Sequence, residues 1–378
     1  MAVTKRFNII ASNYLRIRDV GRGGMGAVFE AIPLDDPSQK VAIKFISSPG
    51  QISHDLLHRF QKEATLMSQL YHPNIITFRE FGLLESTKPD NEEQNDNGYY
   101  IVMELAKGKN LKDVLNTLGN KGMPVEFFFQ VGQQVASALD YTHGKDIIHR
   151  DIKPQNIVIE SMDNEGGKVV AKVLDFGVAS LGESRNFTGV VRKGFDDFAG
   201  TPLYLAPELT KLIDAPADHR VDLYSLGCLL YEILAGTTPF RGNSREELKK
   251  LHATAEPLRL EKIRRDIPTF VCDMVHKLLA KHPDERYQTA FSFFSDLKRA
   301  EELIESLKTG QGVDKATTLL PKLALNDRFK SVSARLSLFG REKEFEKLTQ
   351  FYNAVATESA RGRISVISGG AGIGKSRL

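Results

Sequence analysis

The chain has 378 residues, and its composition is that of a globular protein, with 41% hydrophobic and 26% charged residues. This composition excludes a wholly disordered, collagen-like or membrane-embedded chain. The net charge of +3 is too balanced to indicate nucleic-acid binding, and at about 150 residues per domain the length predicts two to three domains.

The cysteines and the apolar segments indicate a cytoplasmic protein. Cys228 and Cys272 both lie in apolar helical patterns, so we expect no disulfide framework and a reducing environment. No segment holds the roughly 18 uncharged apolar residues of a membrane span. The most apolar segment, 221–236, contains Asp222 and Glu232 and predicts a buried core helix. We therefore expect neither a signal peptide nor a membrane partner.

The first third of the chain predicts a small, strand-rich region that follows a short leader at residues 1–13. Alternating apolar residues between turn residues indicate strands at 14–46, 75–81 and 99–103. Apolar residues at helical spacing predict one helix at 53–70, which ends before Pro73 because a residue preceding proline avoids the α region. The polar segment 85–98 is expected to be a surface loop.

After Leu105 the long patterns are helical. The predicted helices span residues 110–118, 125–144, 220–235, 244–254, 267–280 and 288–307. The exception is a hairpin, in which a strand at 168–174 pairs with 157–159 across the turn-rich segment 162–167. The fold class is therefore α+β, with a small strand-rich lobe followed by a larger helical lobe.

A glycine-rich motif occurs near the start of the strand-rich lobe. Gly21, Gly23, Gly26 and Val28 have the spacing GxGxxGxV. Dinucleotide-binding folds use a similar pattern, but there the glycines lead into a helix, whereas here another strand follows. Because glycine has no side chain, backbone N–H groups of such a loop can approach phosphate oxygens. A simple hairpin turn remains an alternative for this motif alone.

A lysine and a glutamate follow the glycines. Lys44 ends the strand-like sequence Val41-Ala-Ile-Lys44, and its ammonium group needs a counter-charge if it faces an apolar cleft. Glu63, on the predicted helix that follows, is the obvious partner. An ordinary surface ion pair is the alternative for these two residues taken alone.

Three further motifs complete a recognisable set. They are His149-Arg150-Asp151-Ile-Lys153-Pro-Gln-Asn156, Asp175-Phe-Gly177 and Ala206-Pro-Glu208. Five motifs in this order exclude a chance match. Over about residues 14–300 the chain resembles the eukaryotic-type Ser/Thr protein kinases, and the sequence around Gly200–Glu208 resembles their bacterial members. The resemblance implies the bilobal protein kinase fold, with an N-lobe at 14–106 and a C-lobe at 107–300.

The resemblance also implies a site for ATP and Mg²⁺ and a role for each residue. Asp151 would accept the proton of the substrate hydroxyl, Lys153 and Thr201 would assist it, and Glu63 would fix Lys44 on the phosphates. Asn156 and Asp175 would hold Mg²⁺. The residues implied to bind ATP are Val20, Gly21, Gly23, Gly26, Val28, Ala42, Lys44, Met103, Glu104, Ala106 and Val158.

The resemblance also implies structural or regulatory roles for other residues. Asp222 would tie down the catalytic loop, and Arg286 would form a buried ion pair with Glu208. Autophosphorylation at Thr188 could order the segment 175–208 through Arg150, although a solvated loop hydroxyl is an equal alternative for Thr188.

A second phosphate-binding motif lies at residues 369–376. Gly374, Lys375 and Ser376 end a GxxxxGK[ST] sequence that follows an apolar strand pattern at 364–368. Residues 336–378 resemble the start of the P-loop α/β domain of AAA/STAND-type ATPases, after a linker at 301–335. We expect that this module is incomplete, and that the chain is part of a longer multidomain regulator or its reading frame ends early.

Three functions remain open from the sequence. The first is an active Ser/Thr protein kinase that acts on Ser/Thr-containing proteins in signalling, with no nucleic-acid partner. The second is a pseudokinase scaffold, which the complete catalytic set disfavours. The third is a regulatory input module for a downstream ATPase. The sequence indicates neither the protein substrate nor the oligomeric state.

Overall fold

The computed structural model describes residues 9–10, 13–23, 26–47, 64–65, 67–84, 98–117, 119, 121–162, 169–174, 202–309 and 322–328. All of them belong to one compact unit, Met1–Phe329, and residues 330–378 form a second unit. The predicted P-loop and most of the helix predicted at 53–70 lie outside the described residues.

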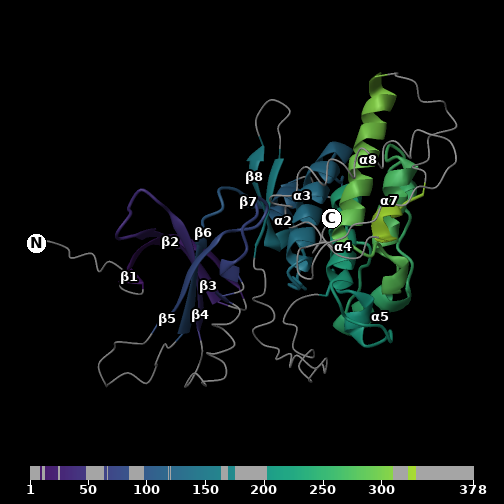
Figure 1. Ribbon diagram of the computed structural model, residues 1–378. Coiled ribbons are helices and arrows are strands. Elements are labelled where there is room, and N and C mark those ends of the chain that lie inside the picture. The colour runs from purple at the N-terminus through teal and green to yellow at the C-terminus, as the bar shows by residue number, and fades with distance from the viewer. Residues whose placement is uncertain are drawn as a thin grey trace, which may run out of the picture. The chain divides into compact units, whose positions relative to one another are not determined.

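The strand-rich lobe is a six-stranded antiparallel sheet (Figure 1). Its strands lie in the order β1-β2-β3-β4-β6-β5, and their bounds are Ile9–Ile10 (β1), Tyr14–Gly23 (β2), Gly26–Pro33 (β3), Val41–Ser47 (β4), Phe78–Leu84 (β5) and Gly98–Glu104 (β6). The alternation of apolar residues predicted from the sequence is confirmed, because Val41, Ile43 and Val102 are fully buried in the small core of this lobe.

The strand predicted at 75–81 begins later, at Phe78, because the residues before it bond to the other lobe. The backbone of Asn74 accepts from Val173 N at 2.9 Å, and Ile76 N donates to Val173 O at 3.0 Å. The side-chain Nδ2 of Asn74 donates to Gln134 Oε1 at 2.7 Å and to Ala171 O at 2.9 Å. This segment therefore joins the two lobes instead of extending β5.

The helical lobe follows. Its elements are α2 (Leu111–Thr117), α3 (Val125–His143), α4 (Arg220–Ala235), α5 (Arg245–Thr254), α6 (Leu260–Ile263), α7 (Thr269–Leu278) and α8 (Ala290–Thr309), with short 3-10 helices η1 (Pro154–Asn156), η4 (Pro207–Thr210), η5 (Pro283–Glu285) and η7 (Leu325–Arg328). The predicted helices are confirmed to within a few residues. Helix α6 was not predicted, because four residues are too short for a periodic pattern.

A three-stranded sheet lies between the sheet of the first lobe and the helices. It has the order β7-β8-β9, with β7 at Lys109–Asn110, β8 at Ile157–Met162 and β9 at Val169–Val173. Strands β8 and β9 pair antiparallel, with Ile157 opposite Val173. The predicted hairpin is therefore confirmed.

Helix α4 is the centre of the helical core. All of its residues are buried, and it packs against α3 and α7 (Figure 1). Gly227 permits the close approach of α7, since a Cβ at this position would lie 2.8 Å from Leu278 Cβ. Gly236 ends the helix in the left-handed conformation, with φ 71°. The segment 221–236 is thus the predicted core helix, and no helix among the described residues is long and apolar enough to cross a membrane.

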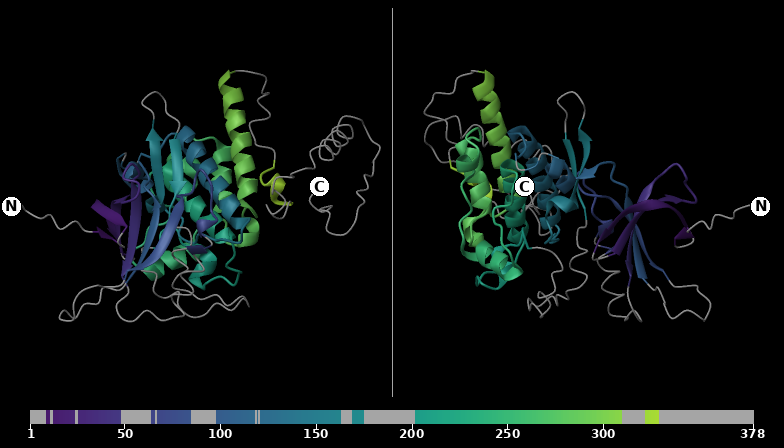
Figure 2. Two further views of the ribbon diagram at one scale, coloured as in Figure 1. Left: turned by 60° about the vertical axis from the view of Figure 1, so that its left-hand side comes forward. Right: turned by 180° about the vertical axis from the view of Figure 1, so that it is seen from behind.

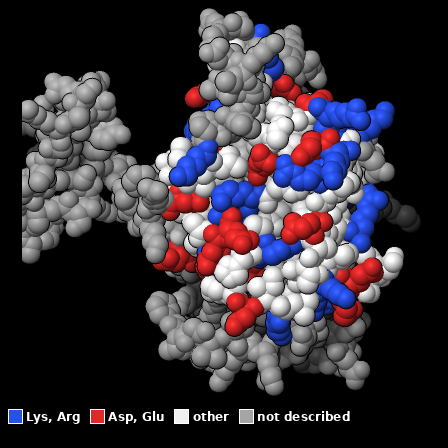
Figure 3. Space-filling view, turned by 90° about the vertical axis from the view of Figure 1, so that its right-hand side faces the viewer, with Lys and Arg blue, Asp and Glu red and all other residues white. Residues whose placement is uncertain are grey.

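The segment predicted as a linker, 301–335, contains ordered elements that pack on the helical lobe. Helix α8 continues to Thr309, and η7 lies against α8 (Figure 2). Asp296 Oδ2 accepts from Ala324 N at 2.8 Å, and Asp327 Oδ1 accepts from Gln288 N at 2.9 Å. Basic and acidic side chains are interspersed over the described part of the molecular face around α7 and α8 (Figure 3).

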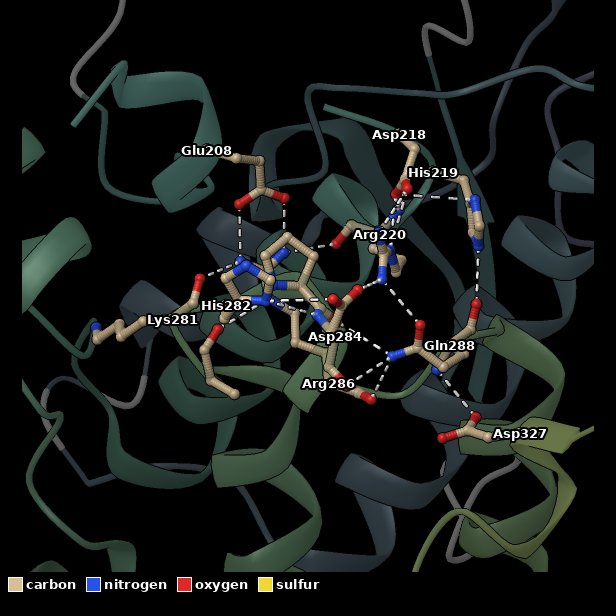
Figure 4. Close-up of polar contacts among 12 residues, drawn as sticks. Glu208, Asp218, His219, Arg220, Lys281, His282, Asp284, Arg286, Gln288 and Asp327 are labelled. Carbon is tan, nitrogen blue, oxygen red and sulfur yellow. Dashed lines mark hydrogen bonds and ion pairs between the residues drawn. The ribbon is translucent and has the colours of Figure 1, made fainter. Parts of the chain in front are cut away.

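A buried ion pair connects η4 to the loop before α8. The guanidinium of Arg286 donates from Nη1 and Nη2 to the two carboxylate oxygens of Glu208, each at 2.7 Å, and both side chains are fully buried (Figure 4). The other donors of Arg286 reach the carbonyl oxygens of Ala280 at 2.8 Å, Lys281 at 2.9 Å and Arg220 at 3.1 Å. The predicted pairing is confirmed, and it fixes η4 to the core.

We expect that Arg286→Met lowers the free energy of unfolding by about 3–5 kcal/mol, because it leaves the Glu208 carboxylate buried without its partner. Urea denaturation at pH 7 measures this loss. The control is Arg265→Met, at an exposed arginine of the same lobe, which should change the free energy by less than about 0.5 kcal/mol. Equal stability of the two variants would contradict the prediction.

Helix α5 buries a histidine. His252 is fully buried, and its Nδ1 lies 2.9 Å from the hydroxyl oxygen of Tyr224. Burial, and the nearby ammonium group of Lys281, lower the pKa of His252 to about 4. The neutral imidazole is therefore the form that the fold requires.

The free energy of unfolding should fall as the pH drops from about 6.5 to 4. In this window the unfolded chain, in which His252 has a pKa near 6.5, binds a proton that the folded chain does not. The loss from this one side chain reaches about 3 kcal/mol. Urea titrations at pH 7, 5.5 and 4.5 should show a shallower pH dependence for His252→Gln than for the unchanged chain, and parallel profiles would refute the assignment.

Candidate active site

The loop that connects α3 to β8, residues 144–156, carries most of the described candidate catalytic residues. Asn156 Nδ2 donates to the carboxylate Oδ2 and to the backbone oxygen of Asp151, both at 2.8 Å. Lys153 Nζ lies 2.7 Å from the same Oδ2. The structure therefore brings Asp151, Lys153 and Asn156 together, as predicted. Within the described residues Asp151 Oδ1 accepts no hydrogen bond, which leaves it available to a ligand hydroxyl.

The buried carboxylate of Asp222, on α4, holds this loop by accepting hydrogen bonds from its backbone. Its Oδ2 accepts from His149 N at 2.8 Å and its Oδ1 accepts from Arg150 N at 2.6 Å. His143 Nε2 lies 2.8 Å from Oδ2. Burial alone would raise the pKa of Asp222, but the hydrogen bonds from the His143 side chain and from the backbone N–H of His149 lower it. The carboxylate stays ionised, and the predicted anchoring role of Asp222 is confirmed.

The anchoring maintains a strained backbone. Arg150 has φ 64°, in the left-handed region that costs a residue with a side chain about 1–2 kcal/mol. The hydrogen bonds that Asp222 accepts from the backbone N–H groups of His149 and Arg150 help to offset this cost. His149 links the loop to a second motif, since its Nε2 lies 2.8 Å from the carbonyl oxygen of Leu174, the residue before Asp175. The position of Asp151 is thus set by the hydrogen bonds of its neighbours His149 and Arg150.

The sheet of the first lobe positions the glycine motif and the lysine. Strands β2 and β3 form a hairpin in which Gly23 pairs with Gly26, so the glycines join two strands, as expected, and do not open a helix. Lys44 pairs with Val28 of β3 and with Ile101 of β6, and its side chain is buried. Ala42 lies two residues before Lys44 and therefore on the same face of β4.

The candidate adenine-binding residues lie on strands of both sheets and just after β6. Ala42 pairs with Met103, and Val158 is buried on β8. Ala106 lies just after β6 and is half-buried, whereas Val20 is 49% exposed on β2. The residues that would contact the base are therefore carried by β2, β3, β4, β6 and β8 and by the segment after β6.

An ion pair at the connection between the lobes was missed by the sequence analysis. Glu104 forms a hydrogen-bonded ion pair with Lys172 of β9, and Glu104 Oε2 accepts from Thr77 N at 3.3 Å. Burial alone would raise the pKa of Glu104, but the hydrogen bonds from Lys172 and Thr77 lower it. Lys172 pairs with Val158 across the hairpin, but this register gives only its neighbour in the sheet, so no sequence signal identifies Glu104 as its partner.

Several predicted site residues lie outside the described part of the chain. They are Glu63, Asp175, Thr188, Thr201, Gly374, Lys375 and Ser376. Their roles stay predictions. Among the described residues, Asn156 fits a Mg²⁺ ligand: because Nδ2 of its amide donates to Asp151, the remaining polar atom is an oxygen, the ligand type that Mg²⁺ prefers.

Comparisons with known proteins agree with this geometry. The family model described as "Protein kinase domain" matches residues 14–297. The Ser/Thr protein kinase PrkC of Bacillus subtilis (strain 168) is 32% identical over 326 residues, which cover 85% of this chain and 45% of PrkC. The Ser/Thr protein kinase PknB of Mycobacterium leprae (strain TN) is 33% identical over 281 residues, which cover 74% of this chain and 42% of PknB.

Solved structures are similar over the same region. A crystal structure of Rad53 in complex with AMP-PNP has a TM-score of 0.57 and 28% identity, and the match covers 75% of this chain and 64% of that one. The PknI kinase domain of Mycobacterium tuberculosis has a TM-score of 0.56 at 24% identity, with 78% and 98% covered, and shows the fold. The chain spans less than half the length of PrkC and of PknB.

We expect that Asp222→Asn loosens the loop while the helices stay folded. An amide side chain offers one oxygen, so one of the N–H groups of His149 and Arg150 loses its acceptor and faces an NH₂ group instead, at a cost of about 1–3 kcal/mol. Hydrogen exchange at these two amides should become at least about tenfold faster. The matched control is Asp146→Asn, at an exposed residue with φ 59°, a conformation that asparagine also adopts. Unchanged exchange in Asp222→Asn would disprove the anchoring role.

Proposed function

The chain belongs to the protein kinase family, and from this premise we propose that it transfers the γ-phosphate of ATP to Ser and Thr hydroxyls of proteins. The observation that carries the proposal is the cluster of Asp151, Lys153 and Asn156 around one carboxylate oxygen. Lys153 is characteristic of the Ser/Thr-specific form of this loop, and both curated relatives described above are Ser/Thr protein kinases.

Each residue of the cluster has a role that its contacts support. Asp151 orients the substrate hydroxyl and accepts its proton at Oδ1, the oxygen with no hydrogen bond within the described residues. Lys153, at 2.7 Å from Oδ2, holds a positive charge where the transferring phosphate passes. Phosphoryl transfer depends mainly on positioning and charge stabilisation, which these groups supply in fixed positions.

We propose ATP and Mg²⁺ as the cosubstrate and the metal. Lys44, braced by Glu63, contacts the α- and β-phosphates, and the glycines of the β2–β3 hairpin cover them. Asn156 and Asp175 are the Mg²⁺ ligands. Bound Mg²⁺ bridges phosphate oxygens and neutralises their charge. In support, the similar Rad53 structure holds AMP-PNP.

We propose that the base lies between strands of both lobes. Val20, Val28, Ala42 and Val158 enclose the adenine ring, and Met103 lies behind it. Backbone groups of Glu104 and Ala106 bond to its edge. The Glu104–Lys172 ion pair supports this arrangement by holding the connection between the lobes in one conformation.

Regulation and context are also proposals. Thr188 is the candidate autophosphorylation site, with Arg150 as the cation that its phosphate would contact. The motif at 369–376 is the start of a P-loop ATPase module, so the kinase would be part of a multidomain cytoplasmic regulator. A pseudokinase scaffold is disfavoured, because Lys44, Asp151 and Asn156 are all present on the elements that catalysis requires.

The decisive experiment replaces Asp151 with Asn. We expect that the purified chain, with Mg-ATP, phosphorylates itself or a generic Ser/Thr acceptor, and that Asp151→Asn lowers this rate by at least about a thousandfold. ATP affinity, measured by calorimetry, should change less than about threefold, since Asp151 does not contact the nucleotide. The control is Asp146→Asn, which should retain full activity. Full transfer by Asp151→Asn would overturn the proposed function.

A further inference from the structure

A pocket of about 350 Å³ lies in the helical lobe, outside the ATP site. Its walls come from α2, from the segment that precedes η4, and from the end of α4 with the loop that follows. Residues that line it include Lys112, Leu115, Leu203, Glu232, Thr238 and Arg241. The volume suits one or two side chains of a bound peptide better than a large cofactor.

The pocket is adjacent to the candidate catalytic loop. Helix α2, which supplies Lys112 and Leu115, packs against η1, the turn that carries Asn156. Leu203 belongs to the segment that leads from Thr201 to η4. Because α2 both lines the pocket and contacts η1, a protein substrate whose hydroxyl reaches Asp151 can extend past α2 into the pocket.

The acidic residue of the pocket is already neutralised. Glu232 is 4% exposed, and Lys112 Nζ lies 2.7 Å from its Oε1. The hydroxyl of Tyr204 donates to the other oxygen, Oε2. Since both carboxylate oxygens are engaged, a cationic side chain of a substrate could bind Glu232 only by displacing one of these partners.

The basic residues of the pocket are in excess. Lys112 has three N–H donors, and its contact with Glu232 uses one of them. Arg241 is exposed and forms no hydrogen bond or ion pair within the described part of the chain. One paired acid and two cations leave a net positive charge in a concave site, where the electrostatic field is stronger than on a convex surface.

We propose that this pocket is a specificity site that binds an acidic side chain of the protein substrate, with Arg241 as the main contact and Lys112 as the second. The inference rests on the proposed kinase function and adds the substrate class, an acidic peptide. Arg241 offers a planar fork of donors that matches a carboxylate. Lys112 can contact the same carboxylate while it keeps its bond to Glu232.

The test uses sets of peptides that share one acceptor serine. At each flanking position in turn the peptides carry Glu, Gln or Lys, and kcat/KM is measured for each peptide. We expect that at one or two positions Glu is favoured over Gln by about tenfold, the effect of one charged contact of about 1.4 kcal/mol. In Arg241→Gln this ratio should fall toward one, and in Arg241→Glu the preference should turn toward Lys.

The matched control is Arg265→Gln, at an exposed arginine of the same lobe that does not line the pocket, which should keep the ratio. A preference for Glu that survives in Arg241→Gln, or equal phosphorylation of all peptides, would overturn this inference and leave the kinase function intact. Failure to phosphorylate any peptide, together with absent autophosphorylation, would overturn the proposed function and this inference with it.

Discussion

The carboxylate of Asp222 is the contact on which the geometry of the candidate active site depends. It accepts from the backbone N–H groups of His149 and Arg150, and it lies on a helix whose residues are all buried. The position of α4 is set by packing against α3 and α7. The loop 144–156 is therefore held in place by the packed core, through Asp222. The position of Asp151 therefore depends on the hydrophobic packing of α4, and the carboxylate of Asp222 connects that helix to the loop.

Hydrogen bonds and an ion pair to one element, strand β9, also connect the two lobes. Asn74 and Ile76 bond to β9 through Val173, and Lys172 on the same strand pairs with Glu104 at the end of β6. Strand β9 thus contacts the segment before β5 and the end of β6, and it ends one residue before Leu174, which bonds to His149. One strand fixes the relation between the candidate ATP-binding sheet and the catalytic loop.

The sequence predicts elements and motifs well because both depend on local spacing. Helices α3, α4 and α8 follow from apolar periodicity, and Asp151, Lys153 and Asn156 follow from one motif. The start of β5 was predicted too early, because Asn74 and Ile76 form hydrogen bonds with Val173 instead of extending the strand. These partners are nearly 100 residues away in the sequence, as are Asn74 Nδ2 and Ala171 O, which are 97 residues apart. Local spacing does not reveal such contacts. Lys172 was missed for a related reason, since strand alternation indicates which face a residue occupies and not which acid it meets.

The pocket beside α2 shows how far such long-range pairing can change a functional conclusion. Taken alone, Glu232 at the end of α4 suggests a site for basic substrates. Lys112 neutralises this carboxylate, although it is 120 residues away in the sequence, and Arg241 then makes the net charge of the pocket positive. In the proposed function, catalysis and substrate choice depend on different parts of the helical lobe: the loop that Asp222 holds would perform the transfer, and the charges around Glu232 would select the peptide. Substitutions in the pocket can therefore change the substrate class without altering the groups that contact the phosphate.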